Sequence, residues 1–311
     1  MNTSLIIARK EFHAAFRNRL FLTITLLFLG LSILSVYIGS TTKRAEMRIY
    51  NETVATLQAD GAAVIPARPE IHTPTILANL IEYVSIVGAI LAVILGTNTL
   101  SKERDSGGLK LILSRPVYRD QLLWGKWLGN TAVLATLLAL VFLFNSVLLV
   151  IVGGIVPTAA ELLRLFVFTL MALAYMLIFF SLAMFLSLRL NNSPNVFLVS
   201  LVVWMVFSFV LPQMAETQMV NSSVVNSISG AINQIPQDTA VSQAINALSP
   251  TWHLRNIGGQ LLESTPGSGA ISSGTLIAHV LTTLLVLLAP TVAFVAASFA
   301  TFLRNETLVL E

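Results

Sequence analysis

Residues 128–152 read LGNTAVLATLLALVFLFNSVLLVIV, a run of 25 positions without one charged side chain. As an α-helix this run is long enough to cross the apolar core of a bilayer, which is about 30 Å thick and takes roughly 20 residues. Five other long apolar runs occur, and the six lie at about 20–39, 75–100, 128–152, 163–187, 196–212 and 275–300. The sequence therefore predicts six transmembrane helices.

The composition of the whole chain agrees with a membrane protein. Of its 311 residues, 55% are hydrophobic and 11% are charged, whereas about a quarter of the residues in soluble domains are charged. The apolar runs do not alternate with polar residues, which excludes a transmembrane barrel and leaves an all-α membrane protein. The absence of cysteine excludes disulfides, thiolate metal sites and cysteine nucleophiles. The first run is longer than a signal-peptide core, and the SVYIGS at its end is a poor cleavage site.

The distribution of basic residues predicts the orientation. Six spans place both termini on one side, where segments 1–19, 101–127, 188–195 and 301–311 hold 12 lysines and arginines in about 65 residues. The opposite segments hold six in over 100 residues. Because basic residues are retained in the cytoplasm, we expect both termini to be cytoplasmic, and the net charge of +3 reflects topology rather than nucleic-acid binding.

Two external segments are long. Segment 40–74 opens with a charged piece that is capable of forming a helix, TTKRAEMRIYNETVATLQAD, and closes with a proline-bearing connector. Segment 213–273 is rich in Ser, Asn and Gln, and its spaced apolar residues predict amphipathic helices lying on the membrane or on a partner. These apolar residues are Val220, Val224, Val225, Ile228, Ile232 and Ile235.

The N-terminal residues 4–19 also show helical periodicity. One face carries Leu5, Ala8, Phe12, Ala15 and Phe16, and the other carries Lys10, His13 and Arg17. A basic amphipathic helix beside a span normally lies flat at the membrane interface, so an elbow helix is expected here. The alternative is a solvated tail.

The stretch 102–126, KERDSGGLKLILSRPVYRDQLLWGK, holds nine of the 33 charged residues of the chain. Its SGG predicts a sharp turn, LKLIL a short apolar element, and SRP the start of a new helix that continues into the third span. Apolar residues exposed in a cytoplasmic loop usually mark contact with another molecule. The alternative is a solvated loop without a partner.

This loop resembles the first cytoplasmic loop of type-2 ABC transporter permeases. The matching residues are Glu103, Gly107, Gly108, Leu109, Leu113, Pro116, Arg119, Leu122, Leu123, Gly125 and Lys126. In addition, IARKEFHAAFRNR is similar to the elbow helix of that family, and LSPTWHLRNI (248–257) to a motif just before its last span. Within the family the sequence looks similar to the permeases of nitrous oxide reductase maturation and their relatives.

The resemblance implies a mechanism. Residues Gly108 to Leu113 would form a coupling helix that seats in a groove of a separate cytoplasmic ABC ATPase subunit. Glu103 and Asp105 would be the charged residues that precede this helix, and Arg115 and Arg119 those that follow it. The implied coupling set is Glu103, Asp105, Gly107, Gly108, Leu109, Leu111, Leu113, Arg115 and Arg119. A second permease copy, identical or similar, would complete the pathway.

Sequence motifs for chemistry are not found in the chain itself. The Gly125-Lys126 pair is followed by Trp127 and does not form a phosphate-binding loop, so ATP hydrolysis is assigned to the partner chain. The four histidines lack metal-ligand spacing, and no catalytic, cofactor-binding or metal residue is predicted.

Glu82 is the one acidic residue inside a predicted span. Such carboxylates usually face a cavity, a partner or a proton path, so Glu82 is a candidate for the translocation path. An interfacial carboxylate that snorkels to water is an equal alternative. An intramembrane hydrolase is disfavoured, because the sequence offers Glu82 no partner.

The function predicted from the sequence is a permease subunit in the cell inner (plasma) membrane that couples ATP hydrolysis to substrate export or translocation. The alternative is a non-transporting anchor or mechanotransmitter, which passes ATPase-driven motion to an extracytoplasmic partner protein.

Overall fold

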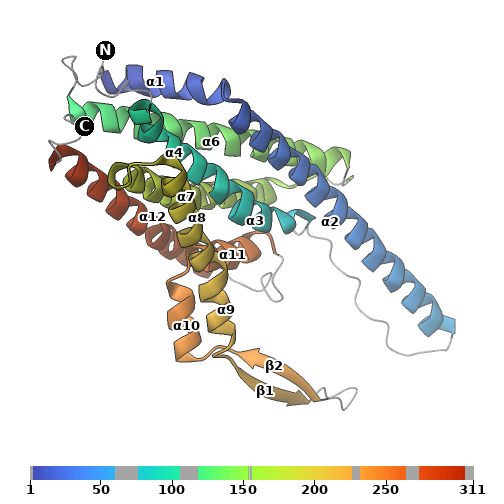
Figure 1. The fold of residues 1–311 in the computed structure, drawn as a ribbon. Helices are drawn as coiled ribbons and strands as arrows, with labels where there is room; N and C mark the ends of the chain where they lie inside the picture. Colours follow the sequence, from blue (N-terminus) through green and yellow to red (C-terminus); the bar gives the residue numbers. More distant parts are fainter. Residues whose placement is uncertain are drawn as a thin grey trace.

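The structure, a computed structural model, describes residues 3–59, 76–105, 118–152, 154, 156–225, 232–263 and 273–304. These residues form a helical bundle with a projecting β-hairpin (Figure 1). Its helical elements, of which η2 and η3 are π-helical, are α1 (Thr3–Phe16), α2 (Arg19–Ala59), α3 (Asn79–Tyr83), η2 (Val84–Gly88), α4 (Ala89–Asp105), α6 (Arg119–Ile151), α7 (Ala159–Arg189), α8 (Ser193–Met205), η3 (Val206–Val210), α9 (Leu211–Glu216), α10 (Ala240–Ala247), α11 (Pro250–Leu261) and α12 (Ser273–Arg304). The strands are β1 (Val220–Val225) and β2 (Ile232–Gln237).

The prediction of six spans is confirmed within the described part of the chain. Six helices are long and apolar enough to cross a membrane, and they run over Phe21–Ala59, Asn79–Ser101, Arg119–Ile151, Ala159–Arg189, Ser193–Glu216 and Gly274–Arg304. Each apolar run continues as helix into its polar flank, so that α6 begins at Arg119 rather than near residue 128. The chain is a multi-pass membrane protein.

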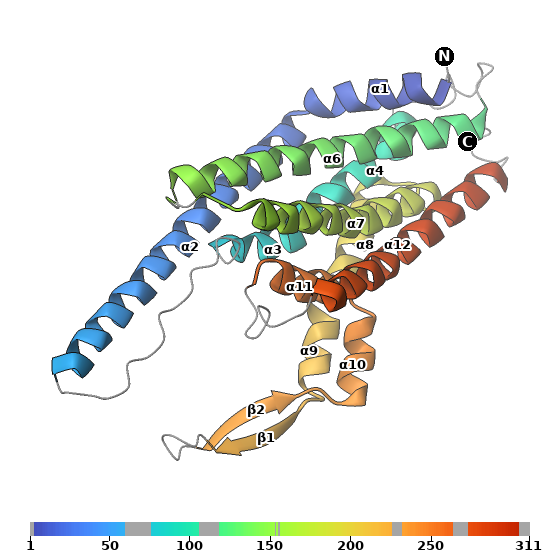
Figure 2. The same cartoon turned by 180° about the vertical axis from the view of Figure 1, so that it is seen from behind.

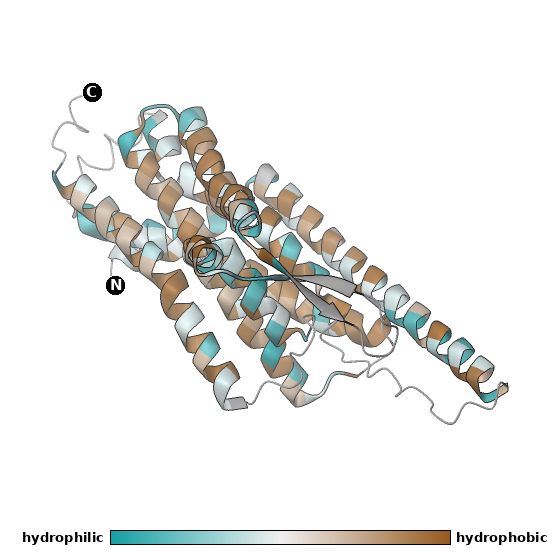
Figure 3. Cartoon of the chain, turned by 90° about the horizontal axis from the view of Figure 1, so that it is seen from below, coloured by the Kyte–Doolittle hydropathy of each residue, from teal (hydrophilic) through white to brown (hydrophobic). Residues whose placement is uncertain are grey.

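The two ends of the bundle differ. The start of α1 and the end of α12 lie together at one end, which we call the terminal end, and the β-hairpin projects from the other, the hairpin end (Figures 1 and 2). The end of α4 and the start of α6, between which segment 106–117 runs, also lie at the terminal end (Figure 1). Hydrophobic residues dominate the helices between the two ends (Figure 3).

Helix α7 is the centre of the bundle. In its most apolar stretch 72% of the residues are buried, against 11% in α12, which packs on its outside. Helices α4, α6, α8, α11 and α12 all contact α7. A helix that is apolar on every side can be surrounded in this way, because each face finds an apolar neighbour.

Gly96 permits the close approach of α4 to α7. A methyl group added at Gly96 would lie 2.7 Å from Ala183 Cβ and closer still to the carbonyl oxygen of Phe180. Small residues allow transmembrane helices to approach through their backbones, which increases van der Waals contact. At Gly96 the α4 backbone therefore packs directly against α7.

Helix α2 extends well beyond the bundle at the hairpin end (Figure 1). Its 41 residues correspond to about 60 Å at 1.5 Å per residue, roughly twice the thickness of a bilayer core. The charged piece that follows the first apolar run therefore continues the span as one helix, as its helix-capable sequence predicts.

The prediction of amphipathic helices is wrong for residues 220–225 and 232–235. These residues lie in an antiparallel hairpin, in which Val220 pairs with Gln237 and Val225 with Ile232. The reason is physical: Val and Ile are β-branched and favour extended backbone, while Ser and Asn compete with helical hydrogen bonds through their side chains. Helices α10 and α11 occupy the later part of the same segment, 213–273.

We predict that Gly96→Ala lowers the thermal unfolding temperature of the detergent-purified protein. The added methyl group has to push α4 away from the α7 backbone, at a cost of about 1–3 kcal/mol. Gly30→Ala is the matched control, because nothing lies within 4 Å of a Cβ built there. An equal response of the two variants would contradict the proposed role of the close approach.

Candidate functional site

The structure describes only part of the predicted coupling set. Glu103 lies near the end of α4, Asp105 is the last residue of that helix, and Arg119 is the first residue of α6. The remaining six members of the set lie outside the described residues; they are Gly107, Gly108, Leu109, Leu111, Leu113 and Arg115. The structure therefore describes α4 and α6, the two helices that precede and follow segment 106–117, but not that segment itself.

These helices are joined by an ionic cluster around Lys126 of α6. Its Nζ lies 2.9 Å from Glu11 Oε1 of α1 and 2.9 Å from Glu103 Oε2 of α4. The Lys126 side chain is 2% exposed, so the two carboxylates replace nearly all of its contact with water. Lys10 lies 3.3 Å from Glu103 Oε1, but its side chain is 64% exposed. Lys126 is thus the buried member that holds three helices together.

Helix α1 lies in a groove made by two glycines that flank Lys126 on α6. A Cβ at Gly125 would lie 2.7 Å from Ile7 Cβ, and a Cβ at Gly129 would lie 2.7 Å from the carbonyl oxygen of Ala8. Because the backbones approach this closely, the side chain of Lys126 reaches both α1 and α4. The N-terminal segment is therefore a helix packed on the bundle, and its inward face contacts α6.

The end of α4 is also fixed to α7. Arg104 Nη1 donates a hydrogen bond of 3.0 Å to the carbonyl oxygen of Ser187 near the end of α7. Such a bond complements the unpaired carbonyls and the partial negative charge at a helix C-terminus. The residue that follows Glu103 thus ties the base of the loop to the central helix.

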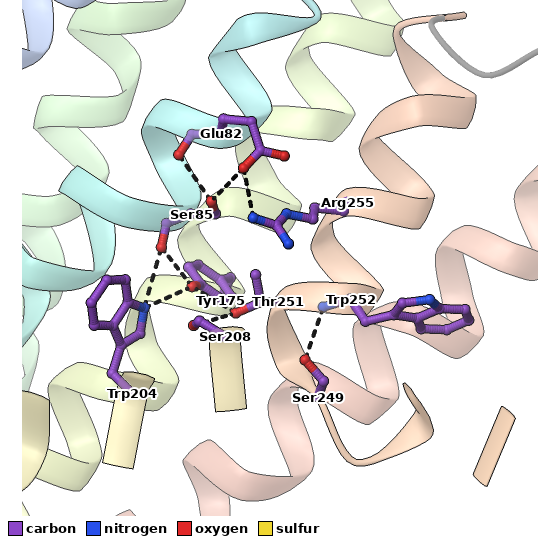
Figure 4. Close-up of polar contacts among 9 residues, drawn as sticks. All are labelled: Glu82, Ser85, Tyr175, Trp204, Ser208, Ser249, Thr251, Trp252 and Arg255. Atoms are coloured by element: carbon purple, nitrogen blue, oxygen red, sulfur yellow. Dashed lines mark hydrogen bonds and ion pairs between the residues drawn. The ribbon is translucent and has the colours of Figure 1, made fainter. Parts of the chain in front are cut away.

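At the hairpin end, Glu82 of α3 has a basic partner. Arg255 Nη2 of α11 lies 2.7 Å from Glu82 Oε2, and the two side chains are 33% and 47% exposed, respectively (Figure 4). The expectation that Glu82 has no partner is wrong, because Arg255 is 173 positions away and only the folding of α11 against α3 brings it near. The pair is half-exposed, so solvent screens it.

A buried hydroxyl network lies beside this pair, centred on Tyr175 of α7 (Figure 4). Tyr175 Oη donates to the Ser85 carbonyl oxygen at 2.8 Å and lies 3.1 Å from Thr251 Oγ1, which lies 2.7 Å from Ser208 Oγ. Each hydroxyl has one proton. Tyr175 uses its proton in the bond to the Ser85 carbonyl oxygen. The Thr251 hydroxyl therefore donates to Tyr175 Oη, and the Ser208 hydroxyl donates to Thr251 Oγ1. Trp204 Nε1 adds a bond of 3.3 Å to the same Ser85 carbonyl.

The network connects the two π-helical turns to α11. Ser85 belongs to η2, and Ser208 belongs to η3. Ser249, the N-cap of α11, donates a bond of 2.5 Å to the Phe207 carbonyl oxygen of η3, while its Oγ accepts from Trp252 N. A π-turn interrupts the regular helical ladder and is frequent at functional sites. Here side chains from α7, α8 and α11 bind the carbonyl groups of both turns.

Sequence reasoning assigned no role to Lys126, Glu11, Arg255 or Tyr175. Lys126 stood in the matched loop pattern, and a lysine seven positions after the start of α6, next to a long apolar run, was a usable signal. Its partner Glu11 is 115 residues away, and periodicity does not pair residues over such a separation. The motif LSPTWHLRNI did contain Arg255 and both network residues of α11, namely Ser249 and Thr251.

Comparison with known proteins gives the family. The model of the ABC-2 family transporter proteins matches residues 5–307. A probable ABC transporter permease protein NosY of Pseudomonas aeruginosa is 31% identical over 157 residues, which cover 50% of this chain and 48% of that protein. A probable ABC transporter permease protein NosY of Stutzerimonas stutzeri is 28% identical over 214 residues, 68% of each chain. The chain thus spans about half the length of the first relative and about two thirds of the second.

The match over nearly the whole chain agrees with the six spans and with the resemblance in the loop. The protein belongs to the ABC-2 family of transporter proteins and is a multi-pass membrane subunit of the ABC permease type.

Proposed function

We propose that this chain couples ATP hydrolysis by a separate cytoplasmic ATPase to the export or translocation of a substrate across the cell inner membrane. The observation that carries the proposal is the Lys126 cluster, which joins α1, α4 and α6 at the point where segment 106–117 leaves the bundle. A loop that transmits force needs such a rigid base. A loop that only connects two helices does not.

The proposed orientation places the terminal end in the cytoplasm. It rests on the 12 lysines and arginines of the segments at that end, against six in the opposite segments. The loop then faces the compartment that contains ATP.

The coupling step follows from the contacts. Leu109, Leu111 and Leu113 bind a groove of the ATPase, and Glu103, Asp105, Arg115 and Arg119 flank that contact and set its register. When the ATPase subunits close on ATP, the loop moves α4 and α6, and α1 follows because Glu11 and Glu103 share Lys126. Arg104 and the close approach at Gly96 carry the movement to α7. The helices shift as rigid bodies.

Two permease copies, identical or similar, enclose the pathway in this proposal, since one bundle of six spans has a filled core rather than a channel. The central helix α7 is surrounded on all sides by its own chain. The second copy therefore has to pack against outer helices, whose apolar side chains are exposed, as in α2 and α8.

Glu82 and Arg255 are proposed to gate the pathway at the hairpin end. Both side chains are half-exposed, and the pair joins α3 to α11, the helix that also binds η3 through Thr251 and Ser249 and is linked to η2 through Tyr175. A charge pair that solvent reaches can break and reform at low cost. This property suits a gate rather than a structural anchor.

A mechanotransmitter is the second candidate. The observation that favours it is the projection of α2 and of the β-hairpin beyond the bundle at the hairpin end (Figure 2). In that function the same ATPase-driven movement acts on an extracytoplasmic protein. ATP-dependent movement of a substrate into vesicles that contain the purified complex would exclude it.

The coupling assignment predicts that Leu109→Asp, Leu111→Asp and Leu113→Asp together abolish co-purification with the ATPase and its stimulation by the permease, because charges replace the apolar contact. Leu303→Asp is the control, since Leu303 is an exposed leucine at the same end of the bundle. Retention of the complex by the triple variant would show that another segment binds the ATPase.

The ionic cluster predicts different effects for two lysines. Lys126→Met leaves two carboxylates facing each other without their cation and destabilises the protein by about 3–5 kcal/mol. Lys10→Met removes an exposed partner and changes stability by less than about 1 kcal/mol. Thermal unfolding of the purified variants measures both.

A neutral cluster separates stability from coupling. Lys126→Met combined with Glu11→Gln and Glu103→Gln removes all three charges and restores folding, but we expect ATPase stimulation to remain low because α1 and α4 no longer share a charged partner. Full stimulation in this variant would show that the cluster is needed only for folding.

The proposed gate predicts that Glu82→Gln and Arg255→Gln each change the ATPase rate of the reconstituted complex at least several-fold, while unfolding temperatures stay close to that of the unmodified protein. The exchange of both charges, Glu82→Arg with Arg255→Glu, restores the rate because it re-forms the pair. Unchanged rates in all three variants would remove the pair from the mechanism.

A further inference from the structure

The outward face of α1 carries charge of one sign. Between residues 3 and 19 the exposed side chains are Leu5, Ile6, Arg9, Lys10, His13, Ala14, Arg17 and Arg19. The one acidic residue of this segment, Glu11, points inward to Lys126. The exposed face is thus basic, with two large apolar residues at its start, and we call it the basic face.

The apolar face of α1 is not available to the membrane. Ile7 and Ala8 contact the glycines of α6, Ala15 is buried, and Phe16 packs edge-on against Phe21 of α2. An interfacial helix would turn this face to the lipid. In this protein the apolar face of α1 packs against the bundle, and the basic face is exposed.

Three arginines of the basic face have no partner in the described part of the chain. Arg9, Arg17 and Arg19 make no side-chain hydrogen bond or ion pair with the described residues, whereas Lys10 pairs with Glu103. Guanidinium groups of like charge on one short helix repel each other unless anions lie nearby. Their planar donors match the oxygen atoms of a phosphate group.

The position of these arginines indicates which anions are present. Arg19 is the first residue of α2, and the exposed apolar side chains of its span begin with Leu22, Leu26 and Leu27. Those side chains face the acyl chains of the bilayer. Arg17 and Arg19 therefore lie at the depth of the lipid head groups, and α1 continues away from them along the bundle.

We propose that the basic face of α1 binds anionic phospholipid head groups in the leaflet at the terminal end. The guanidinium groups of the three arginines bind the lipid phosphates. Basic clusters beside a span bind anionic lipids in this way. The inference is independent of coupling to the ATPase, because it rests on the exposure and charge of α1 alone.

The test measures lipid selectivity. The full-length protein is equilibrated with mixed micelles that contain equal amounts of phosphatidylglycerol and phosphatidylcholine, and the lipids retained after gel filtration are quantified by mass spectrometry. We expect an excess of phosphatidylglycerol that falls when salt is raised from 0.15 to 1 M. Arg9→Gln, Arg17→Gln and Arg19→Gln should each lower the preference, by up to about fivefold per residue.

Two controls keep the test specific. Arg9→Lys, Arg17→Lys and Arg19→Lys together retain most of the preference because the charge is kept. The double variant Lys43→Gln with Arg48→Gln removes charge from α2 at the hairpin end and leaves the preference for phosphatidylglycerol unchanged. Equal retention of both lipids by the unmodified protein would overturn the proposal. A triple glutamine variant that keeps its lipid preference but loses the ATPase would also overturn it, and would assign the basic face to that partner.

Discussion

The Nζ of Lys126 is an ammonium group that the protein removes almost completely from water, and the arrangement of the terminal end depends on how that charge is compensated. Glu11 and Glu103 compensate it from two different helices at 2.9 Å each. Separation of the helices would leave a buried charge without partners, which strongly destabilises the folded state. The ion pairs therefore keep α1, α4 and α6 packed together. The two glycines on either side of Lys126 make this possible, since they let α1 approach α6 closely enough for the contact.

From this cluster a continuous set of contacts leads through the centre of the bundle. Arg104, next to Glu103, binds the end of α7, and Gly96 brings the same helix α4 against the α7 backbone. Tyr175, further along α7, binds Ser85 of η2 and Thr251 of α11. Movement at the proposed coupling loop can reach the proposed gate along two paths: through α7, and along the continuous span of α3, η2 and α4, which carries both Glu103 and Glu82.

The Lys126 cluster at the terminal end and the Glu82–Arg255 pair at the hairpin end differ in burial. At the terminal end Lys126 is buried, and its ion pairs hold α1, α4 and α6 in a fixed arrangement. At the hairpin end Glu82 and Arg255 are half-exposed, and the buried interactions next to them are neutral hydroxyl bonds to the carbonyls of two π-turns. A rigid base at the terminal end, together with a solvent-screened charge pair at the hairpin end, fits the proposed conversion of ATPase closure into movement.

The sequence by itself determined the number of spans and the membrane class, because in lipid an apolar run of about twenty residues can satisfy its backbone groups only as a helix. It also located the N-terminal helix and the charged segment between the second and third spans, because their composition is local. It did not determine the hairpin at 220–237, since helical spacing of valines and isoleucines competes there with their preference for extended backbone. The partners of Lys126, Glu82 and Tyr175 were decided only by the tertiary structure. The pairs Lys126–Glu11, Tyr175–Thr251 and Glu82–Arg255 are 115, 76 and 173 positions apart, and contacts over such separations follow from how the helices pack rather than from any local pattern.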